Sequence, residues 1–260
     1  MRGRVLAIGG SDSGGGAGLQ ADLKTIAAFG AYGATAITAL TVQDTRAVHE
    51  VMVVPPAFVR AQIEVVLADL GADAIKTGML GEPAVVEAVC DALAAAPPDV
   101  PLVVDPVLRA SAGQRLLAEG ALTILKRRLL PRAALLTPNL PEAEVLAGMA
   151  IPDLAAMHHA AAALLTLGVP AVLLKGGHLA GDTVVDLLAT EDGVEEFAAS
   201  RLPGRHTHGT GCTLASAIAS GLAQEMPLRA AVLRARGFVR AAILAAPGLG
   251  AGNGPLNHGV

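Results

Sequence analysis

Aromatic and basic residues are scarce in this sequence. Its 260 residues include no Trp, one Tyr and four Phe, and its formal net charge is −4. The basic residues are scattered and form no block. Proteins that bind nucleic acids neutralise phosphates with Lys and Arg and stack aromatic rings on bases. We therefore expect no nucleic-acid partner.

Long apolar runs are also lacking. No uninterrupted apolar segment approaches the roughly 18 residues typical of a transmembrane helix. The short apolar run after Arg2 and Arg4 reaches Gly9 and Gly10 too soon for the core of a signal peptide. The sequence therefore predicts no membrane segment.

Cysteine is limited to Cys90 and Cys212, which lie far apart. Their spacing fits neither a metal site nor a disulfide framework, so we expect a reducing, cytoplasmic location. Hydrophobic residues make up 53% of the chain and charged residues 16%. Such a composition favours a large buried core and argues against disorder.

Apolar β-branched runs alternate with alanine-rich helical stretches along the whole chain, which predicts a single α/β domain over residues 1–260. The nearly continuous apolar runs indicate a mostly parallel sheet with helices on both faces, which binds ligands beyond the carboxyl ends of its strands. The expected strands are 5–8, 34–42, 73–77, 102–107, 133–137 and 171–175, with a hairpin of 183–188 and 193–198. The expected helices are 17–29, 56–70, 82–95, 116–129, 154–167, 212–224 and 228–245.

A glycine-rich segment, residues 9–18, follows the first expected strand. Gly16-x-Gly18-x-x-Ala21 matches the loose dinucleotide-binding pattern, but about seven residues separate it from the strand, whereas that motif follows its strand directly. No Gly-Lys-Ser/Thr follows, which excludes a Walker A motif. The segment is otherwise a flexible turn or a place where a ligand approaches the backbone closely.

A second glycine-rich segment, residues 207–213, opens an alanine-rich helix. Because Gly209 and Gly211 have no Cβ, the backbone can adopt conformations in which successive N–H groups and the helix N-terminus face one anion. Cys212 at this place should have a lowered pKa and could act as a general base or a nucleophile. The alternative is a glycine-capped turn with a buried cysteine. Cys90 lacks these surroundings and is expected in the core.

Charged and polar residues follow three of the expected strands. Asp105 follows one, Asn139 and Glu142 follow the next, and Lys175 ends a third. Two carboxylates and a lysine at one sheet edge suit Mg²⁺ and phosphates. Together with the second glycine-rich segment they predict phosphoryl transfer, which depends on positioning, charge neutralisation and a base.

The segment from Gly209 to Cys212 resembles the anion hole of ribokinase-like kinases. Most of these kinases have Asp where this sequence has Cys212. In having Cys at this position, the sequence is similar to the hydroxymethylpyrimidine kinases and to some pyridoxal kinases. The resemblance to the hydroxymethylpyrimidine/phosphomethylpyrimidine kinases of thiamine biosynthesis covers nearly the whole chain. It rests on residues 14–25 (GGGAGLQADLKT), 30–33 (GAYG), 77–80 (TGML), 137–143 (TPNLPEA) and 175–179 (KGGHL).

This resemblance implies a ribokinase-like fold, a homodimer, and ATP and Mg²⁺ as cofactors. ATP would phosphorylate the hydroxymethyl group of 4-amino-5-hydroxymethyl-2-methylpyrimidine and then the resulting monophosphate. Cys212 would be the catalytic base and Gly209, Thr210 and Gly211 the anion hole. Further implied roles are ATP binding by Lys175 and Asn139, metal binding by Asp105 and Glu142, and substrate binding by Gln43, Gly10, Asp22 and Met79. The carboxamide of Gln43 offers a donor and an acceptor that complement an aminopyrimidine edge.

Three other functions stay open at this point. A pyridoxal kinase would also accept a heteroaromatic ring with a hydroxymethyl group. A cysteine hydrolase could pair Cys212 with His206 or His208. A ligand-binding protein without catalysis is the third.

One segment departs from the family pattern. After the Asp-Pro-Val motif the family has a Lys and an Asp where this sequence has Ser111 and Gln114. Arg109 either substitutes for the lost cation or is a surface residue.

Overall fold

The computed structural model describes residues 1–110 and 113–260. Over these residues nine strands form one sheet in the order β3-β2-β1-β4-β5-β6-β7-β8-β9. Strands β2, β1, β4, β5, β6 and β7 run parallel to one another, whereas β3 pairs antiparallel with β2, β8 with β7 and β9 with β8. The strands are β1 (Arg4–Asp12), β2 (Tyr32–Gln43), β3 (Val48–Val53), β4 (Ala74–Thr77), β5 (Leu102–Val104), β6 (Leu135–Leu136), β7 (Ala171–Leu174), β8 (Thr183–Thr190) and β9 (Gly193–Ser200). This confirms the mostly parallel α/β sheet.

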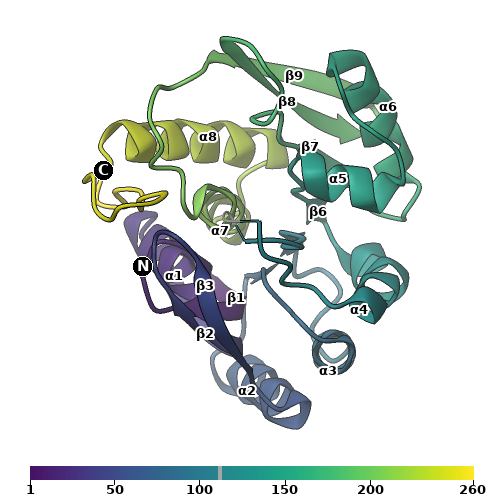
Figure 1. The fold of residues 1–260 in the computed structure, drawn as a ribbon. Coiled ribbons are helices and arrows are strands. Elements are labelled where there is room, and N and C mark those ends of the chain that lie inside the picture. Colours follow the sequence, from purple (N-terminus) through teal and green to yellow (C-terminus); the bar gives the residue numbers. More distant parts are fainter. Residues whose placement is uncertain (111–112) are drawn as a thin grey trace.

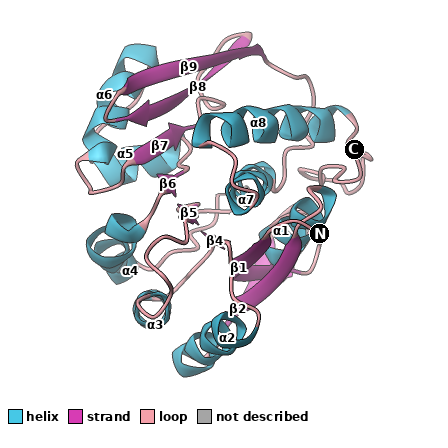
Figure 2. Cartoon of the chain, turned by 180° about the vertical axis from the view of Figure 1, so that it is seen from behind, coloured by secondary structure: helices cyan, strands magenta, loops and turns pink. Residues whose placement is uncertain are grey.

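Helices cover both faces of the sheet (Figures 1 and 2). They are α1 (Gly18–Ala28), α2 (Pro56–Asp69), α3 (Pro83–Leu93), α4 (Glu119–Ile124), α5 (Leu140–Ala147), α6 (Leu154–Leu165), α7 (Thr210–Ala223) and α8 (Leu228–Leu244). A π-helical turn, Leu125–Leu129, and a short 3₁₀ turn, Leu130–Arg132, continue α4.

Successive residues of β1 supply two separate cores, because side chains alternate between the faces of a strand. Leu6 and Ile8 pack in the core under α2, α3, α5 and α6. Val5 and Ala7 pack in the opposite core under α1, α7 and α8. A strand buried on both faces needs apolar residues at every position, which explains its unbroken apolar run.

Several element boundaries differ from the sequence prediction. Strand β1 continues through Gly9 and Gly10 to Asp12, so the first glycine-rich segment is partly strand. Strand β3 and helix α5 were not predicted. Strand β5 stops before Pro106, which lacks the N–H that a sheet ladder needs.

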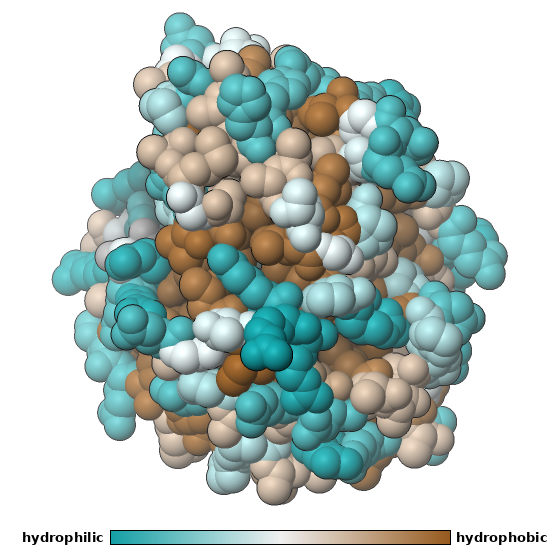
Figure 3. Space-filling view, turned by 90° about the vertical axis from the view of Figure 1, so that its right-hand side faces the viewer, coloured by the Kyte–Doolittle hydropathy of each residue, from teal (hydrophilic) through white to brown (hydrophobic). Residues whose placement is uncertain are grey.

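The side of the molecule at the right of Figure 1, which carries α3 to α6, shows apolar side chains gathered across its middle among polar ones (Figure 3). Across the described part of the chain, no helix combines the length and apolar character needed to span a membrane.

The chain reverses its direction of travel across the sheet beside β1. It proceeds from β1 outward to β2 and β3, then returns to β4 on the other side of β1 and continues to β9. Sheets of this kind bind ligands beyond the carboxyl ends of their strands, at such a switch point.

Candidate active site

A pocket of about 660 Å³ lies at the carboxyl ends of the parallel strands. Its lining includes every residue to which the family resemblance gives a role in the site, whereas His206, a possible partner of Cys212 in a hydrolase, does not line it. The residues with such a role are Gly10, Asp22, Gln43, Met79, Asp105, Asn139, Glu142, Lys175, Gly209, Thr210, Gly211 and Cys212. The fold therefore brings together residues spread over 200 positions of the chain.

The N-terminus of α7 opens into this pocket. Its N-cap, Gly209, has φ +82°, and no side chain caps the helix. A Cβ at Gly209 would lie 1.9 Å from the carbonyl oxygen of Gly16, so the two glycine-rich segments touch through their backbones. The first N–H groups of a helix have no partner within it, and they carry the positive end of its dipole. The end of α7 can therefore bind an anion.

Cys212 lies in the first turn of α7 and is half-buried. Burial, with Asp22 and Asp105 nearby, raises the pKa of its thiol to about 12, although Lys76 and the backbone of Gly18 act to lower it. The lowered pKa expected at the helix N-terminus was therefore wrong, because burial and two carboxylates outweigh the groups that lower it.

Lys175 and Asp105 form an ion pair directly after β7 and β5, with 3.2 Å between Nζ and Oδ1. Burial acts to lower the pKa of Lys175, but Asp105 and Glu142 raise it above its ordinary value. The ammonium group stays charged, and it lines the same pocket as the end of α7. A phosphate chain would meet both positive groups.

Asn139 and Glu142 begin α5 as a capping box. The Asn139 side chain accepts from the Glu142 backbone N–H at 2.9 Å, and the Asn139 N–H donates to the Glu142 carboxylate at 2.8 Å. Burial raises the pKa of Glu142 to about 7, although Lys175 acts in the opposite direction. Both residues thus stabilise α5 as well as lining the pocket.

The described residues hold no group of three or more His, Cys, Asp or Glu side chains arranged as a metal cage. Asp105 and Glu142 are nonetheless two carboxylates that line one pocket and both act on Lys175. Mg²⁺ binds through one or two carboxylates and keeps waters and substrate phosphates as its other ligands. The residues present fit Mg²⁺ that arrives with a nucleotide.

Asp22 lies on α1 at the floor of the pocket and is fully buried. Both its carboxylate oxygens accept from Lys76 Nζ at 2.9 Å, and Ser216 Oγ donates to Oδ1 at 2.7 Å. Burial acts to lower the pKa of Lys76, but the carboxylate of Asp22 raises it. The contact is therefore an ion pair, and Asp22 has polar partners without any ligand.

Gly10 and Met79 face each other across the pocket wall. A Cβ at Gly10 would lie 3.0 Å from the Met79 sulfur, and Thr38 donates to the Met79 carbonyl at 2.6 Å. The glycine thus makes room for the methionine side chain, which is half-buried and available to a flat ring.

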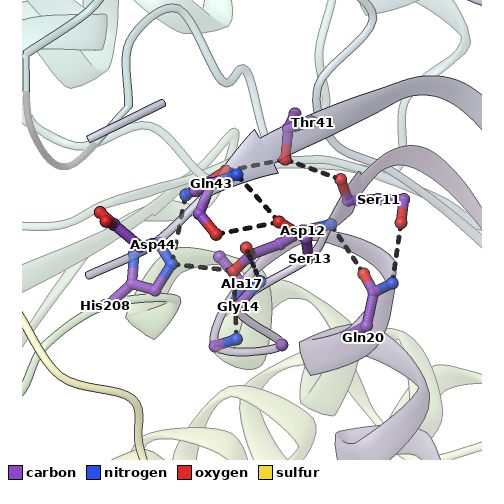
Figure 4. Close-up of polar contacts among 12 residues, drawn as sticks. Ser11, Asp12, Ser13, Gly14, Ala17, Gln20, Thr41, Gln43, Asp44 and His208 are labelled. Carbon is purple, nitrogen blue, oxygen red and sulfur yellow. Dashed lines mark hydrogen bonds and ion pairs between the residues drawn. The ribbon is translucent and has the colours of Figure 1, made fainter. Parts of the chain in front are cut away.

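Gln43 ends β2 beside a polar cluster that sequence reasoning missed (Figure 4). Its amide nitrogen lies 3.3 Å from His208 Nε2, which lies 2.9 Å from Asp12 Oδ2. Asp12 also accepts from the N–H groups of Gly14, Gly16 and Ala17. The carboxylate therefore occupies the backbone N–H donors that the pyrophosphate of a dinucleotide would need. This disfavours a dinucleotide-binding role for the first glycine-rich segment.

After β5, Arg109 pairs with Arg115 in an isolated antiparallel bridge. Arg109 is exposed, lines the rim of the pocket and donates to the Gly113 carbonyl at 3.1 Å. Gln114 is exposed, and Ser111 lies outside the described residues. The role of Arg109 as a replacement cation stays a prediction.

A sheet with its switch point beside β1, an open helix N-terminus and a lysine–carboxylate pair around one pocket define a kinase of the ribokinase-like fold. The chain belongs to the phosphomethylpyrimidine kinase family, whose model matches residues 12–257. The hydrolase alternative for Cys212 is thereby contradicted.

Two relatives illustrate the match. The hydroxymethylpyrimidine/phosphomethylpyrimidine kinase of Streptomyces coelicolor is 50% identical over 257 residues, which are 98% of this chain and 94% of that one. The thiamine biosynthesis bifunctional protein ThiED of Geobacter sulfurreducens is 49% identical over 99% of this chain. The chain spans only 52% of that bifunctional protein.

Solved structures of two kinds share the fold. The phosphomethylpyrimidine kinase of Clostridium difficile has a TM-score of 0.82 at 38% identity, covering 92% of this chain and 99% of that one. The pyridoxal kinase of Staphylococcus aureus, in complex with AMP-PCP and pyridoxal, has a TM-score of 0.91 at 33% identity, covering 100% of this chain and 94% of that one.

Proposed function

We propose that this chain uses ATP to phosphorylate 4-amino-5-hydroxymethyl-2-methylpyrimidine on its hydroxymethyl group, and then phosphorylates the monophosphate to the diphosphate, in thiamine biosynthesis. The observation that carries this proposal is the position of Cys212 at the open end of α7, in the same pocket as Gln43. One end of that pocket suits a phosphoryl group and the other suits a polar ring edge. Family membership supports the same reaction.

The residues divide the chemistry between them. The thiolate form of Cys212 takes the proton of the substrate hydroxyl as the oxygen attacks the γ-phosphorus of ATP, and becomes a thiol. The N–H groups from Gly209 to Cys212 stabilise the charge on the moving phosphoryl group, and Lys175 meets the ATP phosphates. Asp105 and Glu142 would hold Mg²⁺, which supplies further neutralisation of phosphate charge.

The test is a steady-state assay of ADP formation over a set of hydroxymethyl heterocycles, with products identified by mass. We expect the pyrimidine alcohol to be phosphorylated twice and to give the highest kcat/KM. The proposal fails if no product forms from the pyrimidine while ADP appears with another ring. Absence of ADP formation with every ring would instead favour a binding protein.

Pyridoxal kinase activity is the second candidate. It is favoured by the likeness to pyridoxal kinase structures, which at a TM-score of 0.91 is higher than the 0.82 for the phosphomethylpyrimidine kinase. Pyridoxal therefore belongs in the same assay. A kcat/KM for pyridoxal above that for the pyrimidine would exchange the two assignments.

The family resemblance also supports a cytoplasmic homodimer. Exposed apolar side chains on β2 and β3 agree with an interface at this edge of the sheet, since Val42 and Met52 are 55% and 58% exposed. Sedimentation of the wild type and of Met52→Asp tests this. We expect a dimer that the charge at position 52 weakens; a wild-type monomer would reject it.

A further inference from the structure

The side-chain amide of Gln43 has two polar neighbours, Thr41 and His208, and their hydrogen-bonding roles are in conflict (Figure 4). Its oxygen lies 3.2 Å from Thr41 Oγ1, whose hydroxyl also lies 2.9 Å from the Ser11 carbonyl. Its nitrogen lies 3.3 Å from His208 Nε2, which also lies 2.9 Å from Asp12 Oδ2. Thr41 would have to donate one proton to two acceptors, and His208 Nε2 would have to accept from Gln43 while donating to Asp12.

The state of Asp12 decides the role of His208. The carboxylate accepts three backbone N–H groups, from Gly14 at 2.8 Å, Gly16 at 3.1 Å and Ala17 at 2.8 Å. Burial acts to raise the pKa of Asp12, but the hydrogen bonds from His208, Ala17 and Gly14 outweigh it and hold that pKa below its usual value. An ionised carboxylate can only accept, so Nε2 of His208 carries a proton and is a donor.

The Ser11 carbonyl decides the role of Thr41 in the same way. A carbonyl can only accept, so the single proton of the Thr41 hydroxyl goes to Ser11 O, the nearer acceptor. The hydroxyl oxygen is then an acceptor toward Gln43. Gln43 therefore faces an acceptor at Thr41. At His208 it faces an N–H that already donates to Asp12, so an NH₂ group on that side would meet donor against donor, whereas a carbonyl oxygen would share this proton with Asp12.

We propose that the Gln43 amide is held with its NH₂ toward Thr41 and its carbonyl oxygen toward His208, and that Thr41, Asp12 and His208 thereby determine which ring edge the kinase accepts. The two ends of an amide have nearly the same shape, so its partners decide their order. Each end keeps one free valence: a second N–H on the nitrogen and a second lone pair on the oxygen. The ring must then present an acceptor nitrogen on the Thr41 side and an exocyclic amino donor on the His208 side.

The surroundings keep this arrangement rigid. Ser13 Oγ donates to the backbone carbonyl of Gln43 at 2.9 Å and accepts from the backbone N–H of Gln43 at 2.8 Å. These two bonds fix the backbone from which the amide extends. A Cβ at Gly16 would lie 2.6 Å from His208 Cδ2, so the imidazole packs against a glycine. The amide can therefore reverse only by losing a partner.

This inference rests on the proposed function, and it predicts discrimination between two isosteric rings. The 4-aminopyrimidine offers a ring acceptor and an amino donor, whereas its 4-oxo analogue offers a ring N–H donor and an oxo acceptor. A site that pairs with one edge leaves its polar groups unpaired against the reverse edge. Wild type should prefer the amino ring, and loss of the Thr41 hydroxyl should free the amide to turn.

The experiment measures kcat/KM for both rings in wild type, Thr41→Val and Thr41→Ser, with folding checked by thermal melting. We expect the amino-to-oxo ratio to fall at least roughly tenfold in Thr41→Val. Thr41→Ser keeps the hydroxyl and should keep the ratio, with the KM for ATP the same in all three. An unchanged ratio in a folded Thr41→Val overturns the proposal.

A second measurement does not depend on turnover. The ¹⁵N resonances of the His208 ring, assigned by their absence in His208→Gln, report whether Nε2 is protonated. A proton on Nε2 supports the proposal, and a neutral ring protonated only at Nδ1 overturns it. If the wild type phosphorylates neither pyrimidine, the proposed function fails, while this spectrum still decides whether His208 Nε2 is a donor beside Gln43.

Discussion

Two opposing influences act on the thiol of Cys212. The helix N-terminus favours the thiolate, but burial and the carboxylates of Asp22 and Asp105 favour the thiol and raise its pKa to about 12. The thiol is therefore protonated at neutral pH in the free chain. To act as a base it must first lose this proton, so only the small fraction of the chain that carries the thiolate can take the proton of the substrate hydroxyl.

The first prediction concerns the pH dependence of this base. A base whose pKa lies above the assay range is deprotonated tenfold more with each pH unit, so kcat/KM of the wild type should rise through neutral and alkaline pH. In Cys212→Asp the rise should move to lower pH, because a carboxyl group ionises there. Cys212→Ala should lose at least about 10²-fold in kcat. Near-wild-type turnover of a folded Cys212→Ala would falsify the role.

The second prediction concerns Gln43 as the contact to the ring. Gln43→Leu leaves the polar edge of the pyrimidine unpaired, at a cost of about 1–3 kcal/mol, or roughly 5- to 150-fold in KM. The KM for ATP should hardly change. Gln114→Leu, at an exposed position outside the pocket, is the matched control. Equal damage to both KM values would make Gln43 a structural residue.

Individual site residues were predictable where they stand at the end of a strand or the start of a helix. Asp105, Lys175 and Cys212 were found in this way. Asp12 was missed, and His208 was considered only as a possible partner of Cys212. Their contact joins residues 196 positions apart, and no local sequence pattern indicates it. Lys76 was missed for a similar reason, since it reads as part of a short buried strand and its partner Asp22 lies on another element.

Among the elements, the longer helices were predicted to within a few residues, because their apolar periodicity is strong. Helix α5 was missed although Asn139 and Glu142 form a capping box at its start, which is a local signal. Strand β3 was missed because it lies at the edge of the sheet, where four of its six residues are exposed, and because its apolar run, residues 51–54, is short and ends at Pro55. Its pairing with β2 comes from tertiary context.

The third prediction concerns the contact between the two glycine-rich segments. Gly209 has φ +82°, and an added Cβ would lie 1.9 Å from the Gly16 oxygen. Gly209→Ala should therefore force the start of α7 away from the pocket, with strain of about 1–3 kcal/mol and a large loss of kcat. Melting temperature and kcat together measure it.

Gly237→Ala in α8 is the control for this change. Nothing lies within 4 Å of an added Cβ there, and Ala is favoured over Gly inside a helix by roughly 0.5–1 kcal/mol. It should melt at or above the wild-type temperature with unchanged kcat. A Gly209→Ala variant that behaves like Gly237→Ala would show that the close contact is not needed.

The fourth prediction concerns the loop after β5. The second phosphorylation has an anionic acceptor, which needs a cation or N–H donors near its phosphate to offset repulsion from ATP. Arg109 lines the rim of the pocket. Arg109→Ala should slow phosphorylation of the monophosphate more than that of the alcohol, as measured by kcat/KM for each. An equal fall for both acceptors, or none, would mean that Arg109 is only a surface residue.

At the scale of the whole molecule, the buried ion pair of Asp22 and Lys76 joins three elements. Asp22 belongs to α1, Lys76 to the central strand β4, and Ser216, which also bonds to Asp22, to α7. Both charged side chains are almost fully buried, at 0% and 1% exposure. The pair therefore holds two helices of one face against the sheet directly beneath the pocket.

The fifth prediction separates this structural role of Asp22 from the substrate contact that the family resemblance implies. Asp22→Asn leaves the ammonium of Lys76 buried without a counter-charge, and removal of one partner from a buried pair costs about 3–5 kcal/mol. With about 2–4 °C per kcal/mol for a chain of this size, the melting temperature should fall by roughly 6–20 °C. Lys76→Met should cost a similar amount, because Asp22 then loses its cation. Asp22→Leu combined with Lys76→Met buries no charge and should melt above either single variant, a pattern that direct contact with substrate would not produce. If Asp22→Asn melts with the wild type and only the KM for the pyrimidine rises, Asp22 acts on the ring and the ion pair contributes little to the fold.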